Sequence, residues 1–393
     1  MKTVLAWALF DLANTFFAVA MLSFYFPLWV VETRGAKELA FSIALSVSMV
    51  CVAVLMPFCG ALSDATGARM RFLRWTTYGC AGATLLASGT SQLWVALILF
   101  GLANICYQLG TVFYDALLWT IAPQERLGQT SGLGASFGYL GSLIGLLLLW
   151  PFVRAGGYHA AFAPSAFFFL LFALPSFLLI RERPSAPRMP WRQLAHTAQR
   201  RLAETIRSAS VLSGLWHFLW ASFFSLNAIN TVLAFMAIYT RKVLGFTSEE
   251  VVRFFAFSHC FAIAGSLIFG FWSAPWGAKR TLTLIWLGWM AALGLIMANP
   301  SADWLWVAGP LIGFCLGSTW ATSRVLVTEL SPKDRLAEMF GLAGLVARAS
   351  SIPGPLVWGW LVWDPARYPI AIMLLIGLLA IGVWLLQRVQ VVG

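Results

Sequence analysis

Long apolar stretches separated by short polar segments are the main pattern along this chain. An α-helix needs about 20 predominantly apolar residues to cross the hydrocarbon core of a bilayer. The sequence predicts twelve spanning helices, at 4–31, 39–62, 73–90, 93–121, 130–153, 160–180, 211–240, 250–273, 281–299, 304–329, 338–362 and 368–386. The pattern therefore indicates an all-α integral membrane protein.

The second half of the chain repeats the first. GALSDATGAR at 60–69 is echoed by GFWSAPWGAK at 270–279, and APQERLGQTSGL at 122–133 is echoed by SPKDRLAEMFGL at 331–342. Aligning the prolines of the second pair places Asp115 opposite Arg324. We therefore expect two pseudo-symmetric six-helix bundles, residues 1–180 and 211–393, joined by a linker at 181–210.

Composition and charge agree with a membrane protein. Of the 393 residues, 60% are hydrophobic and only 10% are charged, whereas soluble domains carry roughly 25% charged residues. Of the 26 Lys and Arg residues, 17 lie in one set of alternate loops and the termini. Basic residues concentrate on the cytoplasmic side, so both termini are expected there. The same distribution argues against a nucleic-acid partner for the net charge of +11.

The first apolar run and the linker fit an orientation with both termini in the cytoplasm. The run 4–31 is much longer than the core of a cleavable signal, about 7–15 residues, so it is expected to be the first spanning helix. In the basic linker 181–210, Trp191, Leu194, Ala198, Leu202 and Ile206 form one apolar stripe. The linker is either an amphipathic helix on an anionic leaflet or a solvated tether.

A polar stripe marks the fourth predicted helix. Asn104, Gln108, Thr111 and Asp115 are spaced four, three and four residues apart, which places them on one helix face. A charge facing lipid is costly, so the stripe should point toward protein or water. We expect Asp115 and Arg324 to be buried across the pseudo-symmetry axis. They either form a structural ion pair between the halves or meet substrate or a proton.

Two further helices carry candidate polar residues. Asp11 and Asn14 lie on one face of the first helix, and Asn227 and Asn230 form a similar pattern in the seventh. Asp11 is either a proton-coupling acid or a carboxylate satisfied by hydrogen bonds between helices. Five amide side chains are expected to shape a substrate site, those of Asn14, Asn104, Gln108, Asn227 and Asn230. All of them except Asn14 have the alternative role of holding helices together.

Arg348 and the loop near residue 64 complete the candidates. Arg348 lies about ten residues into the stretch 338–362, where it either binds an anionic substrate group or pairs with a carboxylate. The loop contains Gly60, Asp64, Gly67 and Arg69. Its glycines allow close helix approach and a tight turn, and Asp64 can accept from a helix N-terminus or a basic residue. We expect these four residues to control the opening of the cytoplasmic side.

Enzymatic chemistry is not indicated. The sequence has no nucleophile-elbow, zinc-protease or nucleotide-binding motif, and its six cysteines form no metal-ligand pattern. We expect no enzyme activity, no cofactor and no metal.

Several segments resemble a known family. AWALFDLANTFF (6–17), VFYDALLWTIAP (112–123), SGLGASFGYLG (131–141), ATSRVL (321–326), AEMFGL (337–342) and ASSIPGP (349–355) resemble the vacuole effluxer-like branch of the major facilitator superfamily. By position, Asp11, Asn14, Ser323, Arg324, Glu338, Gly341 and Pro355 fall in family motifs. Asn227 stands where an acidic residue is common, and Asp115 where an asparagine is common. The resemblance implies the major facilitator fold, with inverted three-helix repeats around a central cavity, and amino-acid efflux.

These observations together predict a secondary active transporter that moves a small polar or zwitterionic solute by alternating access. Protons are a candidate coupling partner. A transporter of amphiphiles, lipids or drug-like molecules, and a membrane sensor that transports nothing, are the alternatives. We expect a monomer in the lipid bilayer of a bacterial inner membrane.

Overall fold

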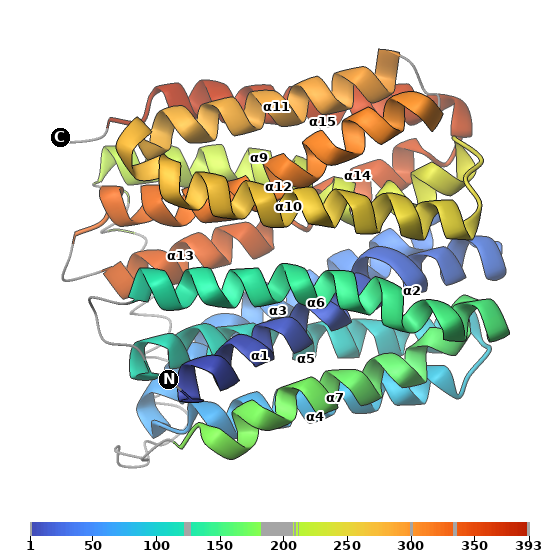
Figure 1. Cartoon of the computed structure of the whole chain (residues 1–393), viewed down its shortest axis with the longest axis horizontal. Coiled ribbons are helices and arrows are strands. Elements are labelled where there is room, and N and C mark those ends of the chain that lie inside the picture. The colour runs from blue at the N-terminus through green and yellow to red at the C-terminus, as the bar shows by residue number, and fades with distance from the viewer. Residues whose placement is uncertain are drawn as a thin grey trace. The chain divides into compact units, whose positions relative to one another are not determined.

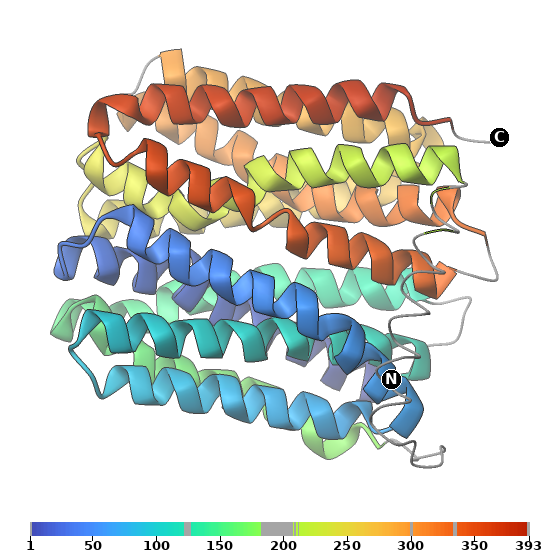
Figure 2. The ribbon, with the colours of Figure 1, turned by 180° about the vertical axis from the view of Figure 1, so that it is seen from behind.

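A computed structural model of the chain describes residues 2–121, 127–181, 207, 210, 212–298, 302–332 and 336–390. Every regular element within these ranges is helical, and Figures 1 and 2 show the helices from opposite sides. Most of the linker 181–210, with its predicted amphipathic stripe, lies outside the described residues.

The first half of the chain forms a continuous series of helical elements. These are α1 (Lys2–Ala18), η1 (Val19–Phe24), α2 (Tyr25–Leu28), η2 (Trp29–Thr33), α3 (Glu38–Thr66), α4 (Arg69–Ser88), α5 (Leu93–Ile121), α6 (Leu127–Gly156), η4 (Tyr158–Ala161) and α7 (Phe162–Leu179). The elements η1 and η2 are π-helical, so the first predicted span is one unbroken helical segment with two wide turns.

The second half repeats the arrangement. Its elements are α9 (Ser213–Lys242), α10 (Ser248–Trp276), α11 (Ala278–Ala298), α12 (Ala302–Leu330), α13 (Leu336–Ala349), α14 (Pro353–Leu361), η6 (Pro365–Arg367) and α15 (Tyr368–Gln387). The predicted span 338–362 is found as the candidate span Met339–Leu361, but it is not one continuous helix, because the chain leaves the α-helix between α13 and α14. Two prolines, Pro353 and Pro355, begin α14, and proline removes the amide hydrogens that would continue the helix. Figure 2 shows the interruption.

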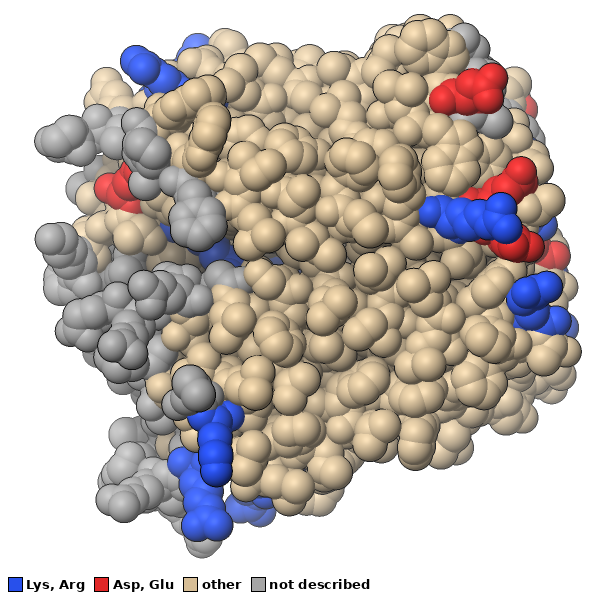
Figure 3. Space-filling view, in the orientation of Figure 1, with Lys and Arg blue, Asp and Glu red and all other residues tan. Residues whose placement is uncertain are grey.

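Eleven segments of the described chain are long and apolar enough to cross a membrane. Together with α4, which is the third predicted stretch and begins with Arg69, Arg71 and Arg74, they account for the twelve predicted spans. In Figure 3, charged side chains gather near the helix ends and leave the middle of the visible surface without them. The chain is therefore a multi-pass integral membrane protein.

The duplication is visible in the backbone. Helices α3 and α10 both have 29 residues, as do α5 and α12. Gly67, which follows α3, has a φ of 58°, and Gly277, which follows α10, has a φ of 85°. Gly35 and Gly245 precede the same two helices with φ of 64° and 69°. Glycine adopts this left-handed conformation without the steric penalty of a Cβ, so both copies turn in the same way.

The chain divides into two compact units. Unit 1 comprises residues 1–36 and 47–203, and unit 2 comprises residues 37–46 and 204–393. The division near residue 203 falls within the linker. The assignment of residues 37–46, the start of α3, to unit 2 is a feature that hydrophobic patterning does not predict.

Candidate functional site

In unit 1, the polar stripe of α5 runs from a buried to an exposed environment. The side chain of Asn104 is 1% exposed, and its Nδ2 donates to Ser48 Oγ of α3 at 2.7 Å. Gln108 is half-buried, and Asp115 is exposed. Asn104 therefore holds α5 to α3, which is one of the two roles expected for it.

The expected burial of Asp115 and Arg324 is not found, because both side chains are exposed. Asp115 lies six residues before the end of α5 at Ile121, and Arg324 lies six residues before the end of α12 at Leu330. Both are within two turns of a helix end. Both also lie inside segments long and apolar enough to span the membrane. Each helix thus presents a charge within its span.

Asp11 lies where α1 and α6 approach most closely. A Cβ at Gly138 would stand 3.1 Å from Asp11 Oδ2, and one at Gly141 would stand 2.2 Å from the backbone oxygen of Leu12. Thr15 Oγ1 donates to the Gly138 carbonyl oxygen at 2.5 Å. Glycines in α6 therefore bring a bare backbone against the half-buried Asp11, and Thr15 supplies a hydrogen bond between the helices. Asn14, on the same stretch of α1, is 5% exposed.

The loop between α3 and α4 contacts the helix that carries Asp115. Gly67 makes the tight turn with its φ of 58°, and Arg69 Nη1 donates to the Ala116 carbonyl oxygen at 3.2 Å. Close approach does not explain Gly60, since nothing among the described residues lies within 4 Å of a Cβ built there. The side chain of Asp64 lies outside the part of the chain that the structure describes.

In unit 2, Asn227, Asn230 and Arg348 meet at the interruption between α13 and α14. Asn230 Nδ2 contacts Ser351 Oγ at 2.8 Å, Ser350 Oγ at 3.2 Å and the Ala347 carbonyl oxygen at 3.4 Å. These partners all belong to the last residues of α13 and the turn that follows. One amide on α9 therefore contacts the end of α13 and the turn that follows, through one carbonyl oxygen and two serine hydroxyl groups.

The other two residues flank this contact. Asn227 is 3% exposed, and a Cβ at Gly354 would stand 2.1 Å from Asn227 Oδ1. Glycine at 354 thus allows α14 to pack directly on α9. Arg348 lies in the last turn of α13, not in the middle of a long helix as expected, and its Nη1 donates to the Gly344 carbonyl oxygen at 3.1 Å. A cation near a helix C-terminus interacts favourably with the helix dipole.

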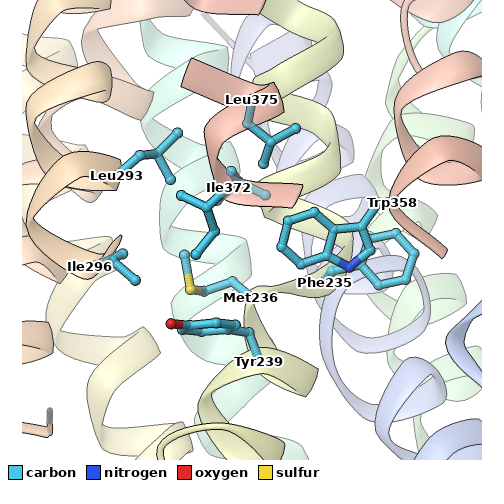
Figure 4. A pocket seen from close by; sticks show the side chains of 9 residues that line it. Phe235, Met236, Tyr239, Leu293, Ile296, Trp358, Ile372 and Leu375 are labelled. Atoms are coloured by element: carbon cyan, nitrogen blue, oxygen red, sulfur yellow. The ribbon is translucent and has the colours of Figure 1, made fainter. Parts of the chain in front are cut away.

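A small cavity in unit 2 lies between α9, α11, α14 and α15 (Figure 4). Its volume is about 20 Å³, on the order of one water molecule. The lining is apolar and aromatic, made by Val232, Phe235, Met236, Tyr239, Leu293, Ile296, Trp358, Ile372 and Leu375. This cavity is too small and too apolar to hold a polar solute.

One polar cluster, centred on Glu38, is not predicted by the sequence. Glu38, the first residue of α3, contacts Lys242, Trp358 and Tyr368. The partners are separated from it by 204, 320 and 330 residues, so no local pattern could reveal them. The sequence shows Glu38 only as an acidic residue at the edge of an apolar stretch, which is a weak indication of a buried polar cluster.

Known proteins resemble this chain over nearly its whole length. The family described as vacuole effluxer Atg22 like matches residues 123–392. An uncharacterized protein of Aquifex aeolicus is 28% identical over 91% of this chain and 89% of that protein. The uncharacterized MFS-type transporter YxiO of Bacillus subtilis is 25% identical over 98% of this chain and 94% of that protein.

A solved structure shares the fold. It is the inward-facing, unoccupied structure of a bacterial homolog of the human lysosomal transporter Spinster, with a TM-score of 0.74, 14% identity and coverage of 98% of this chain and 97% of that chain. The fold and the sequence matches agree with the resemblance found in the sequence motifs. The chain belongs to the vacuole effluxer Atg22-like family and is a transporter of the major facilitator type, not an enzyme.

Proposed function

We propose that this transporter moves a small zwitterionic solute of the amino-acid type. The observation that carries the proposal is the pair of opposite charges at equivalent positions of α5 and α12. Asp115 and Arg324 each lie within a candidate span, and each side chain is exposed. An amino acid presents one ammonium and one carboxylate, which match these two charges. The resemblance to amino-acid effluxers supports the same class of solute.

In this proposal Arg324 binds the carboxylate of the solute. Its planar guanidinium can donate two parallel hydrogen bonds to a carboxylate. Asp115 attracts the ammonium group or takes a coupling proton. The fold family and its repeats support alternating exposure of the solute to the two sides of the membrane.

The amide residues divide into two groups. Asn14 and Gln108 are proposed to contact the solute as hydrogen-bond partners. Asn104 and Asn230 donate to neighbouring helices, which supports a positioning role for them, and Asn227 packs against α14. Asp11 and Arg348 are proposed to contribute charge near the solute path, and the loop of Gly60, Asp64, Gly67 and Arg69 to control its opening.

The membrane context is part of the proposal. We expect a monomer in a bacterial inner membrane, with the termini in the cytoplasm because most Lys and Arg residues lie on that side. Efflux is expected from the family resemblance.

The test is a thermal-shift screen of the purified full-length protein against amino acids, sugars, nucleosides, drug-like molecules and lipids. A ligand that binds the folded state raises its apparent stability. Stabilisation by amino acids, lost in Arg324→Ala, supports the proposal. Stabilisation by amphiphiles or lipids alone would contradict it and favour the amphiphile transporter. Amino-acid binding without exchange in a counterflow assay would indicate a sensor.

A further inference from the structure

Glu38 is the one acidic side chain that is buried among the described residues, with 2% exposure. It is the first residue of α3 and lies in the segment 37–46, which belongs to unit 2 although the rest of α3 belongs to unit 1. A charge buried at this point needs partners, because an isolated buried carboxylate is strongly unfavourable. Its partners come from three other helices of unit 2.

Those partners surround both carboxylate oxygens. The Tyr368 hydroxyl, at the start of α15, donates to Oε1. Trp358 Nε1, on α14, donates to Oε2 at 3.1 Å. Lys242 Nζ, at the end of α9, lies 3.4 Å from Oε1. The carboxylate therefore joins the start of α3 to α9, α14 and α15 at once.

The rest of the segment supports the same attachment. Ser46 Oγ donates to the Ile352 carbonyl oxygen at 3.0 Å. A Cβ at Gly359 would stand 2.1 Å from Ser42 Oγ, so α14 packs directly against this part of α3. These contacts carry no charge, whereas hydrogen bonds to an ionised carboxylate are roughly twice as strong as neutral ones. Glu38 is the charged member of this attachment.

The charged and titratable groups around Glu38 come from every neighbouring element. Lys242 and Tyr239 are on α9, and Tyr368 is on α15, where its ring meets that of Tyr239 edge-on. Lys37 lies over the Trp363 ring, 3.2 Å from its centroid. In the connection before α15, Arg367 pairs with Asp364 at 3.7 Å. Lys242 is thus the cation that contacts Glu38.

The ion pair is suited to reversible opening. The Lys242 side chain is 38% exposed, and its 3.4 Å contact is longer than the 2.7–2.9 Å of a strong charge-assisted hydrogen bond. Loss of the ammonium would leave a buried charge without a counter-charge, which is strongly unfavourable. A proton on the carboxyl group removes that charge. The new O–H also needs an acceptor, and the Tyr368 hydroxyl oxygen can serve only if its own proton turns away from the carboxyl group, so protonation rearranges this contact.

The cavity in Figure 4 gives one of the partners room to move. Trp358 and Tyr239 both line it. The Trp358 ring stacks on Phe235 with a centroid distance of 5.9 Å, and its nitrogen binds Glu38. A side chain that borders unfilled space can shift with less disturbance than one in a close-packed core.

We propose that Glu38 is a proton-binding latch. In its ionised form it holds residues 37–46 on α9, α14 and α15, and in its protonated form it releases Lys242 and loosens this segment from unit 2. The use of the latch during transport rests on the proposed function, whereas the latch itself does not. A segment of α3 whose attachment responds to protons would link proton uptake to movement of that helix.

Hydrogen–deuterium exchange of the full-length protein in lipid nanodiscs tests the latch without any solute. We expect Glu38→Gln to raise exchange of residues 37–46 several-fold at about pH 8. The matched control is Glu249→Gln, which removes an exposed acid from the first turn of α10, and it should exchange like the wild type. Between about pH 8 and about pH 4, a range that includes the ordinary glutamate pKa, the difference between wild type and Glu38→Gln, compared at equal pH, should shrink.

Two results would overturn the proposal. One is wild-type protection of residues 37–46 in Glu38→Gln, and the other is a difference between the proteins that stays constant across the pH range. If Glu38→Gln does not fold, Tyr368→Phe replaces it, since that change removes one donor and keeps the ring. Raised exchange of 37–46 in Tyr368→Phe supports the latch, and unchanged exchange contradicts it. A finding that the protein transports no amino acid would refute the proposed function. It would not affect the exchange measurement on residues 37–46, which tests the latch.

Discussion

Asp115 and Arg324 occupy the same position in two helices of equal length, each six residues before the end of a 29-residue helix. One is an acid and the other a base. The duplication therefore kept the backbone position and changed the sign of the charge. The proposed function assigns a different charged group of the solute to each of these two side chains.

We expect Asp115→Asn to reduce amino-acid flux in proteoliposomes by roughly tenfold or more, the loss that corresponds to about 1.4 kcal/mol of binding. The reason is that the amide keeps the shape of the side chain and loses the charge that attracts an ammonium group. Asp303→Asn is the control, since Asp303 is an exposed acid in the first turn of α12. Equal flux in wild type and Asp115→Asn would show that the carboxylate is not required.

Gly141→Ala should destabilise unit 1. The added methyl group would stand 2.2 Å from the backbone oxygen of Leu12, so α1 and α6 would have to separate, and overpacking of this kind costs about 1–3 kcal/mol. Thermal unfolding of the purified protein measures the effect. Gly82→Ala is the matched control, because no atom of the described residues lies within 4 Å of a Cβ at that helical position. A Gly141→Ala protein as stable as Gly82→Ala would contradict the close packing.

Asn230→Ala should loosen the interruption between α13 and α14. The substitution removes the amide that makes part-buried contacts with Ala347, Ser350 and Ser351, and a hydrogen bond of this kind contributes about 0.5–1.5 kcal/mol to stability. The melting temperature should fall, and exchange of residues 346–353 should rise. Gln387→Ala serves as the control, since Gln387 makes an exposed hydrogen bond to Thr283. Unchanged exchange at 346–353 would refute this role of Asn230.

Gly67→Ala should strain the turn between α3 and α4. A residue with a Cβ pays roughly 1–2 kcal/mol in the left-handed region, and Gly67 has a φ of 58°. We expect a lower melting temperature and the same direction of change for Gly277→Ala, the equivalent position in unit 2. Gly60→Ala has no such strain, and a Cβ there meets no atom within 4 Å in the part of the chain that the structure describes, so it should not lower stability. Equal behaviour of Gly60→Ala and Gly67→Ala would argue against the turn geometry.

The spans were predictable because each must supply about 20 apolar residues. The predicted stretch 304–329 became α12, Ala302–Leu330, and 39–62 became α3, Glu38–Thr66. The repeat at an offset near 209 also predicted that α5 and α12 would correspond. These features depend on local composition, which a sequence displays directly.

Features that depend on contacts between distant residues were not predictable. The apolar run 338–362 predicts one continuous helix, whereas the structure has an interruption at residues 350–352. Pro353 and Pro355 are the local signal of this interruption. The exposure of Asp115 depends on which helices cover α5 near its end, and the cluster around Glu38 depends on partners more than 200 residues away. The π-helical turns of η1 and η2 have no distinct signal among ordinary apolar residues.

The most direct test of the central claim is counterflow of radiolabelled amino acids into proteoliposomes loaded with the unlabelled amino acids, comparing wild type with Arg324→Ala. Arg253→Ala, which removes an exposed arginine paired with Glu249, is the control. We predict exchange in the wild type and in Arg253→Ala, and its loss in Arg324→Ala. Absence of amino-acid exchange in the wild type, or undiminished exchange in Arg324→Ala, would contradict the account.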